Sequence, residues 1–185
     1  QQLATEALQE IRIKHRWQAI DDENLALEQA KTQKSIYLPE VLSNGDTVKQ
    51  LLARSRYLLY GKQDNWSKEQ HHRAVLLFER YPDIEKAYSL SQQLSWIFNN
   101  TADKLYAFAR LAKWNEKVEQ SGFKAFNTVS RTISLHHKKI LNYFDNKSTN
   151  ASAESFNAKI KAFRSQFRGV GDINFFLFRL TKLFA

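Results

Sequence analysis

Apolar side chains recur at helical spacing along most of the chain, with polar residues between them. Residues 3–34 carry this pattern and suit one or two helices. The acidic run at 21–23 could cap the second of these, because carboxylates favour a helix amino terminus. At 37–46 a proline and an Asn-Gly-Asp turn signal interrupt the pattern, which predicts a break with room for a short hairpin.

The middle of the chain reads as a helical bundle. Further helices are expected at 47–60, at 68–80 after an amino-cap at Ser67, for about forty residues from Asp83, and at 123–144. The Asn-Asn-Thr sequence at 99–101 predicts a break within the forty-residue stretch. Apolar residues keep the helical period on both sides of that break, as in a bundle: Leu90, Leu94, Ile97 and Phe98, then Leu105, Phe108, Ala109 and Ala112.

Composition supports a mainly α-helical fold. Hydrophobic residues make up 43% of the 185, with 13 Phe, 7 Tyr and 4 Trp as bulky core material. Five Gly and two Pro are few for the many tight turns of an all-β protein. There is no Cys for a disulfide or a thiolate site, and no run of about 20 apolar residues that could span a membrane. The chain also lacks Met, so it is expected to be a piece of a longer protein.

The net charge of +9 predicts a polyanionic partner, because a basic surface releases counterions when it binds nucleic acid. The charge is concentrated at the carboxyl end. After residue 154 six cations face one carboxylate, Asp172, so the last 31 residues carry +5 of the +9. The polar run 145–150 precedes this segment and is the best candidate for a boundary.

Residues 151–168 predict an amphipathic helix with an apolar stripe and a polar row beside it. The row reads Glu154, Asn157, Lys161, Arg164 and Arg168. A carboxylate in the first turn could ligate a divalent metal, and the amide and cations could follow a phosphate backbone. A solvated polar face, which any amphipathic helix shows, explains the same row.

The chain from residue 142 resembles the closing signature of the ISL3 family of insertion-sequence transposases, in which an Asn-Ala-x-x-Glu-x-x-Asn-x-x-Ile-Lys pattern precedes an Arg, a Gly and an aromatic helix. The matching residues are Asn150, Ala151, Glu154, Asn157, Ile160, Lys161, Arg164, Gly169, Phe176 and Arg179. The segment 47–60 and the spaced Trp66 and Gln70 resemble the family's helical middle region. The chain departs from the family at 170–172, where many members carry an aromatic residue and an Arg.

This resemblance implies a ribonuclease H-like catalytic core in which an Asp, Asp, Glu triad holds Mg²⁺ or Mn²⁺. Glu154 would be the Glu of the triad, and both Asp residues would lie outside this chain, with the core's sheet. Residues 1–20 would be the helix after the second Asp, 21–145 a helical insertion domain, and 146–185 the returning core helices. The whole protein would cut and join DNA as a homo-oligomer in the bacterial cytoplasm, at the nucleoid and not at a membrane, whereas this fragment alone would be inactive.

Other interpretations stay open on the sequence alone. A free-standing helical DNA-binding module without catalysis would share the basic carboxyl end, and a protein-interaction domain would share the helices. The His pairs at 71–72 and 136–137 suggest metal, but helical neighbours point about 100° apart, which favours surface or packing roles. The acidic groups at 21–23 and 83–85 fit helix starts. Trp66, Trp96 and Trp114 could stack on bases, but without basic residues beside them in sequence, core packing is favoured.

Overall fold

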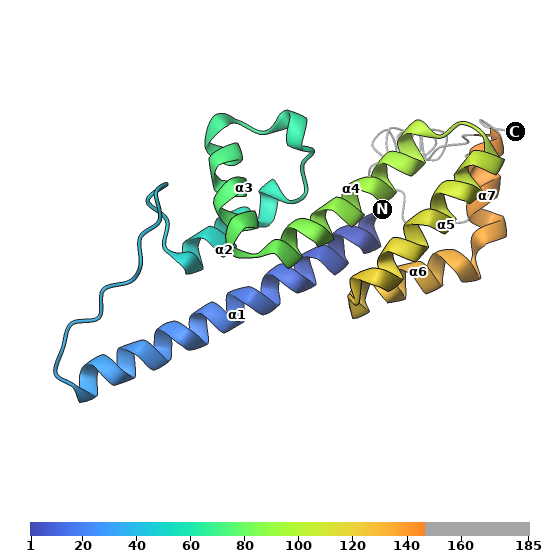
Figure 1. Cartoon of the computed structure of the whole chain (residues 1–185). Coiled ribbons are helices and arrows are strands. Elements are labelled where there is room, and N and C mark those ends of the chain that lie inside the picture. Colours follow the sequence, from blue (N-terminus) through green and yellow to red (C-terminus); the bar gives the residue numbers. More distant parts are fainter. Residues whose placement is uncertain (147–185) are drawn as a thin grey trace, which may run out of the picture. The chain divides into compact units, whose positions relative to one another are not determined.

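The computed structural model describes residues 1–146 and confirms a mainly α-helical protein (Figure 1). The elements are α1 (Gln2–Thr32), α2 (Val48–Leu58), the 3₁₀-helix η1 (Gln63–Asn65), α3 (Lys68–Arg80), α4 (Pro82–Asn100), α5 (Lys104–Ser121), α6 (Lys124–Leu135) and α7 (His137–Asn146). Within these residues the only β-structure is an isolated bridge between Val41 and Thr47. The ribonuclease H-like core therefore stays a prediction.

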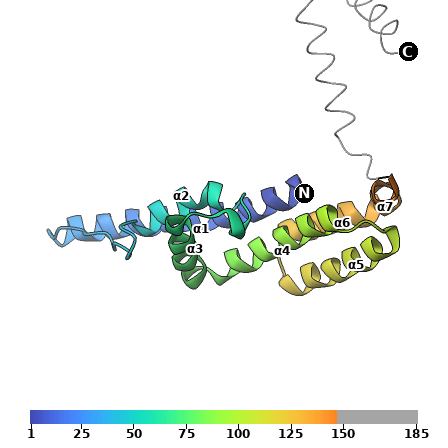
Figure 2. The same cartoon turned by 90° about the horizontal axis from the view of Figure 1, so that it is seen from above.

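The chain divides into two compact units, Gln1–Phe144 and Asp145–Ala185. In the first unit, α1 packs against α2, α4 and α6, while α3 contacts α2 and α4, and α5 contacts α4 and α6 (Figures 1 and 2). One continuous core joins these helices. Its most deeply buried large side chains include Leu8, Leu51, Leu52, Leu77, Ile84, Leu94, Trp114 and Phe126.

α1 is one uninterrupted helix, so the prediction that residues 21–23 cap a second helix is wrong. The segment contains no Gly or Pro that would end a helix, and its acidic side chains have other partners. Asp22 accepts a hydrogen bond from Gln18 one turn earlier (2.9 Å), and Glu23 forms an ion pair with Lys49 of α2. These carboxylates therefore stabilise the middle of the helix and its contact with α2.

The expected hairpin before α2 is reduced to the single bridge between Val41 and Thr47. Gly45 adopts a positive φ of 79°, which a residue with a side chain rarely adopts. The turn is closed by the backbone N–H of Leu42, which donates to the carbonyl of Asp46 (2.9 Å). It leads directly into the amino-cap of α2.

The predicted starts and breaks of the middle helices are confirmed. Thr47 and Ser67 each form a capping box, with Gln50 in α2 and Gln70 in α3. α4 ends at Asn100, at the expected break, and Asp103 caps α5 through the N–H groups of Leu105 and Tyr106. The acidic residues at 83–85 lie in the first turn of α4, as expected from the helix dipole.

Two features further along the chain differ from what the apolar pattern suggests. The row formed by Leu105, Phe108, Ala109 and Ala112 is exposed, and α5 instead buries Ala107, Leu111, Trp114 and Val118. The two rows share the same period, and packing against α4 and α6 selects the one that contains Trp114. The single helix expected at 123–144 is broken at His136, which leaves helical geometry (φ −104°, ψ 17°), so α6 and α7 run in different directions (Figure 1).

Within residues 1–146 no helix combines the length and the apolar character that crossing a bilayer requires.

Candidate functional site

The predicted catalytic and metal-ligating Glu154 lies outside the residues that the structure describes, as do the predicted DNA-contacting Asn157, Lys161, Arg164 and Arg168. Their roles stay predictions. In the first unit, charged or aromatic side chains gather in three places that could serve function. These are an ion network around Asp46, a polar hollow beside α1, and a surface on α4 and α5.

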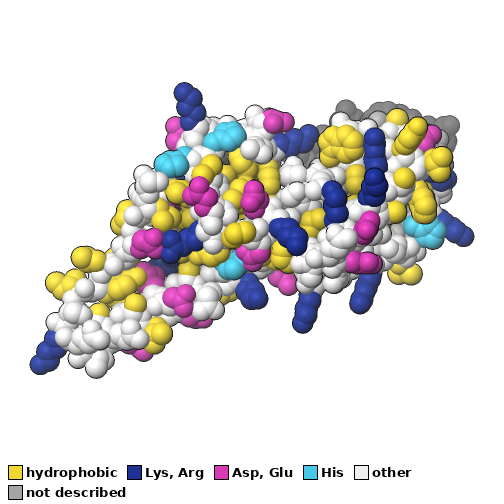
Figure 3. All heavy atoms as spheres, viewed as in Figure 1, with side chains coloured by type: hydrophobic (Ala, Val, Ile, Leu, Met, Phe, Trp, Pro, Cys, Tyr) yellow, Lys and Arg dark blue, Asp and Glu magenta, His cyan; other side chains and the backbone are white. Residues whose placement is uncertain are grey.

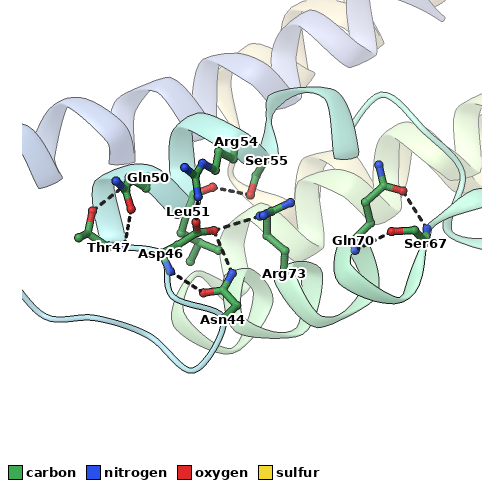
Figure 4. A network of polar contacts seen from close by, with 10 residues as sticks. All are labelled: Asn44, Asp46, Thr47, Gln50, Leu51, Arg54, Ser55, Ser67, Gln70 and Arg73. Carbon is green, nitrogen blue, oxygen red and sulfur yellow. Dashed lines mark hydrogen bonds and ion pairs between the residues drawn. The ribbon is translucent and has the colours of Figure 1, made fainter.

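The first place is the buried carboxylate of Asp46, which follows the turn before α2 (Figure 4). Arg54 of α2 and Arg73 of α3 both bind it, the latter at 3.1 Å, and Asn44 donates to it at 2.9 Å. Burial opposes ionisation of Asp46, but the hydrogen bonds from the two arginines outweigh it and hold the pKa of the carboxyl below its ordinary value. The protein itself saturates this carboxylate, so the network joins α2 to α3 and has no role for a ligand.

The second place is a hollow of about 270 Å³ between α1, the 37–40 segment and the start of α2. Its charges are largely paired with one another. Arg80 donates two hydrogen bonds to Glu40 (2.9 and 2.7 Å), and these bonds lower the pKa of the Glu40 carboxyl and raise the pKa of Arg80. His15 contacts Asp83 and packs its ring against Tyr81. Because these pairs connect neighbouring elements, we interpret the hollow as a junction between helices.

Metal ligation finds no support in the first unit. Among the described residues, no three His, Cys, Asp or Glu side chains lie close enough together to hold an ion. The neighbouring histidines point to different partners, as predicted. His71 lies edge-on to the Trp66 ring, whereas the Nε2 of His72 lies 3.0 Å from the Ser43 hydroxyl. This part of the chain therefore does not supply the oxygen-rich donor set that Mg²⁺ or Mn²⁺ needs.

The tryptophans separate into two kinds. Trp66 and Trp114 are 9% and 1% exposed, and their indole N–H groups donate to the carbonyls of Leu58 (3.1 Å) and Leu90 (2.8 Å). Core packing is confirmed for both. It is wrong for Trp96, which is 50% exposed on α4 and carries the guanidinium of Arg110 over its ring at 4.7 Å.

Trp96 borders a hollow of about 270 Å³ between α4 and α5, the third place. Its described lining contains three cations, Arg110, Lys113 and Lys117, and no carboxylate. Spacings of three and four residues place these cations in one row along α5. Figure 3 shows Lys and Arg side chains among hydrophobic ones over this part of the unit. We call Gln93, Trp96, Arg110, Lys113 and Lys117 the α4–α5 surface.

The sequence around Trp96 gives no sign of this surface, because no basic residue is next to Trp96 along the chain. The cations come instead from the next helix. α4 and α5 are joined by only three residues, 101–103, so they return antiparallel and pack against each other. The regular spacing of the three cations was the available signal, together with the short connection that brings α5 back along α4.

A helical chain with a strongly basic carboxyl end and a cationic, aromatic surface is typical of proteins that bind polyanions, nucleic acid among them. The family model for ISL3 transposases of the DDE type matches residues 1–180, so this chain belongs to that transposase family. No curated protein and no solved structure gives a significant match. The predicted family is thus confirmed, and a free-standing DNA-binding module is not favoured.

Proposed function

We propose that this chain supplies the last carboxylate of a DDE triad, Glu154, to a transposase that cleaves the ends of an insertion sequence and transfers them to target DNA. The observation that carries the proposal is the family match over residues 1–180, which includes the Asn150 to Lys161 pattern around Glu154. A carboxylate in that pattern has a chemical reason to be there, because hard divalent cations prefer oxygen ligands.

Bound Mg²⁺ or Mn²⁺ would activate the attacking hydroxyl or water and stabilise the leaving oxygen at a DNA phosphate. The residues of this chain would provide a metal ligand and neutralise the phosphates of the DNA. Glu154 offers one oxygen ligand, and two Asp carboxylates of the whole protein would complete the set. Among the described residues, no three His, Cys, Asp or Glu side chains lie close enough together to hold an ion by themselves. Lys161, Arg164 and Arg168 neutralise phosphates along the strand, and the Asn157 amide adds a hydrogen bond to the backbone.

The proposed organisation assigns residues 1–20 to the helix after the second Asp, 21–145 to the insertion domain and 146–185 to the returning core helices. The exposed faces of α1 support this division. Leu3, Ile13 and Trp17 share one side of α1 and stay exposed in the first unit, as expected for a helix that packs on a further element. Assembly as a homo-oligomer on DNA in a bacterial cytoplasm belongs to the same proposal.

The decisive test is Glu154→Gln in the full-length enzyme. The amide keeps the shape of the side chain and loses its metal-ligand charge, so strand cleavage should fall to background while binding to the terminal repeats persists. Cleavage of a labelled end substrate and a gel-shift assay measure the two activities.

The matched control is Glu119→Gln, which removes a carboxylate from an exposed position of α5. This variant should cleave like the parent enzyme. Full cleavage by Glu154→Gln would show that Glu154 is not a member of the triad. Equal loss of cleavage in both variants would show that the assay responds to general damage to the protein.

A further inference from the structure

Trp96 is half exposed on α4, although the sequence favours a place for it in the core. Single exposed apolar residues are common, so exposure alone carries no argument. Trp96 differs because it borders two hollows: the one shared with α5, and a larger one of about 550 Å³ toward residues 62–64. Its ring is held by the helix and by the stacked guanidinium of Arg110. An aromatic ring held in this way is a preorganised surface for a second flat group.

Two of the three cations beside Trp96 have neutral hydrogen-bond partners. Arg110 donates to the hydroxyl of Thr101 (2.8 Å) and Lys117 to the amide oxygen of Gln93 (2.8 Å), and both partners are neutral. In the part of the chain described, neither these two cations nor Lys113 forms an ion pair with a carboxylate. The row therefore presents three positive charges to solvent along about two turns of α5.

The two hollows differ in charge, which orients a ligand. The larger hollow is lined by Asp64 and Glu85 as well as Lys62, whereas every charged residue in the described lining of the α5-side hollow is a cation. Phosphates would therefore lie on the α5 side. A base stacked on Trp96 would face the larger hollow, whose lining includes the Ser95 hydroxyl and the side-chain amides of Gln92 and Asn100.

We propose that the α4–α5 surface binds an unpaired stretch of a DNA strand, with a base stacked on Trp96 and the neighbouring phosphates on Arg110, Lys113 and Lys117. This inference rests on the proposed function, which makes DNA the substrate. Duplex DNA would use the cations but hides its base faces within the stack, and an acidic peptide would leave the indole unused. Exposed aromatics beside cations suit single strands, whose bases offer free π-faces.

The test measures binding of a fluorescein-labelled single-stranded oligonucleotide, and of the same sequence as a duplex, to the 185-residue chain in EDTA. Trp96→Ala should weaken single-strand binding roughly tenfold, in line with the contribution of a base–aromatic stack, and should change duplex binding little. Trp96→Phe should retain most of the affinity. Because the oligonucleotide should quench Trp96 in particular, its quenching of tryptophan fluorescence should shrink in Trp96→Phe.

The matched control is Trp17→Ala, which removes an indole that is 60% exposed on α1. It should bind the single strand like the parent. Replacing Lys113 and Lys117 with Gln should reduce the salt dependence by about 0.7 per lost phosphate contact. The same replacement at Lys14 and Lys31, both exposed on α1, should not.

Equal single-strand affinity of Trp96→Ala and the parent chain overturns the proposal, as does unchanged quenching in Trp96→Phe. Equal losses for single strand and duplex would show that only the phosphates are bound, and would also overturn it. If anionic vesicles bind with the same dependence on Trp96, the surface binds lipid and the proposal is overturned. These readouts use no metal and no cleavage, so they are independent of the Glu154→Gln result.

Discussion

Asp46 carries more interactions than any other carboxylate of the described unit, and it joins the consecutive helices α2 and α3. Its carboxylate is fully buried and receives Arg54 from α2 and Arg73 from α3. Burial of a charge is unfavourable unless ion pairs and hydrogen bonds offset it. The stability of the α2–α3 contact should therefore depend on the ionised form of this side chain.

Replacing Asp46 with Asn should lower the free energy of unfolding by about 3 kcal/mol, near the lower end for breaking a buried ion pair because Arg54 is itself half exposed. Because the pKa of Asp46 is lowered in the folded state, its contribution to stability is present above the unfolded pKa of about 3.9 and is lost as pH falls through the folded pKa. Urea titrations of parent and variant at neutral and acidic pH measure both effects.

The difference between the two proteins should thus shrink as the solution is acidified. Asp21→Asn, at an exposed position of α1, is the control and should cost less than about 0.5 kcal/mol. A difference between Asp46→Asn and the parent that grows at low pH would contradict the assigned ionisation. The sequence predicted only the turn at 44–46, because the partners of Asp46 depend on how α2 packs against α3.

At the scale of elements, the connection between α5 and α6 depends on one backbone conformation. Gly122 ends α5 in the left-handed region, with a φ of 72°. A Cβ added there would meet nothing within 4 Å, so the cost of a side chain comes from the backbone alone. Gly122→Ala should lower stability by about 1 kcal/mol, and Gly122→Asn by less, since Asn tolerates this region.

Thermal unfolding followed by circular dichroism measures the change. Gly61→Ala is the matched control, because its φ is not positive and its new Cβ would sit at ordinary contact distances of 3.5 Å from Leu58 and Trp66. Equal losses at both glycines would indicate that packing, and not the left-handed backbone, sets the cost.

Local signals explain which elements could be predicted. Caps such as Thr47 and Ser67 act within one turn of their own helix, so the sequence locates them well. The buried face of α5 and the break at His136 depend on neighbouring helices. The apolar spacing of Phe126, Ile133, Ile140 and Phe144 continues through the break, which is why the period alone predicted one helix. The same dependence on packing concealed the cations beside Trp96.

At the scale of the molecule, two groups of cations are the proposed DNA contacts. One is the α4–α5 surface of the first unit, and the other is the carboxyl end, where the predicted row contains Lys161, Arg164 and Arg168. Carboxylates that could hold a metal are scarcer. Residues 1–146 contain no such cluster, and the sequence beyond them offers Glu154 and Asp172 as its only acidic side chains. Binding and cleavage should therefore be separable in this chain.

We expect the purified 185-residue chain to bind DNA with strong salt dependence but not to cut it in Mg²⁺ or Mn²⁺. Each phosphate contact releases counterions, whereas in-line attack at phosphorus needs two ions held by several carboxylates. Replacing Lys161, Arg164 and Arg168 with Ala should lower the salt slope by up to about one unit per lost contact. Fluorescence anisotropy over a salt series and a cleavage gel measure the two properties. Metal-dependent cleavage by this chain would mean that the chain itself contains carboxylate partners for Glu154. An unchanged salt slope would mean that Lys161, Arg164 and Arg168 do not contact the DNA.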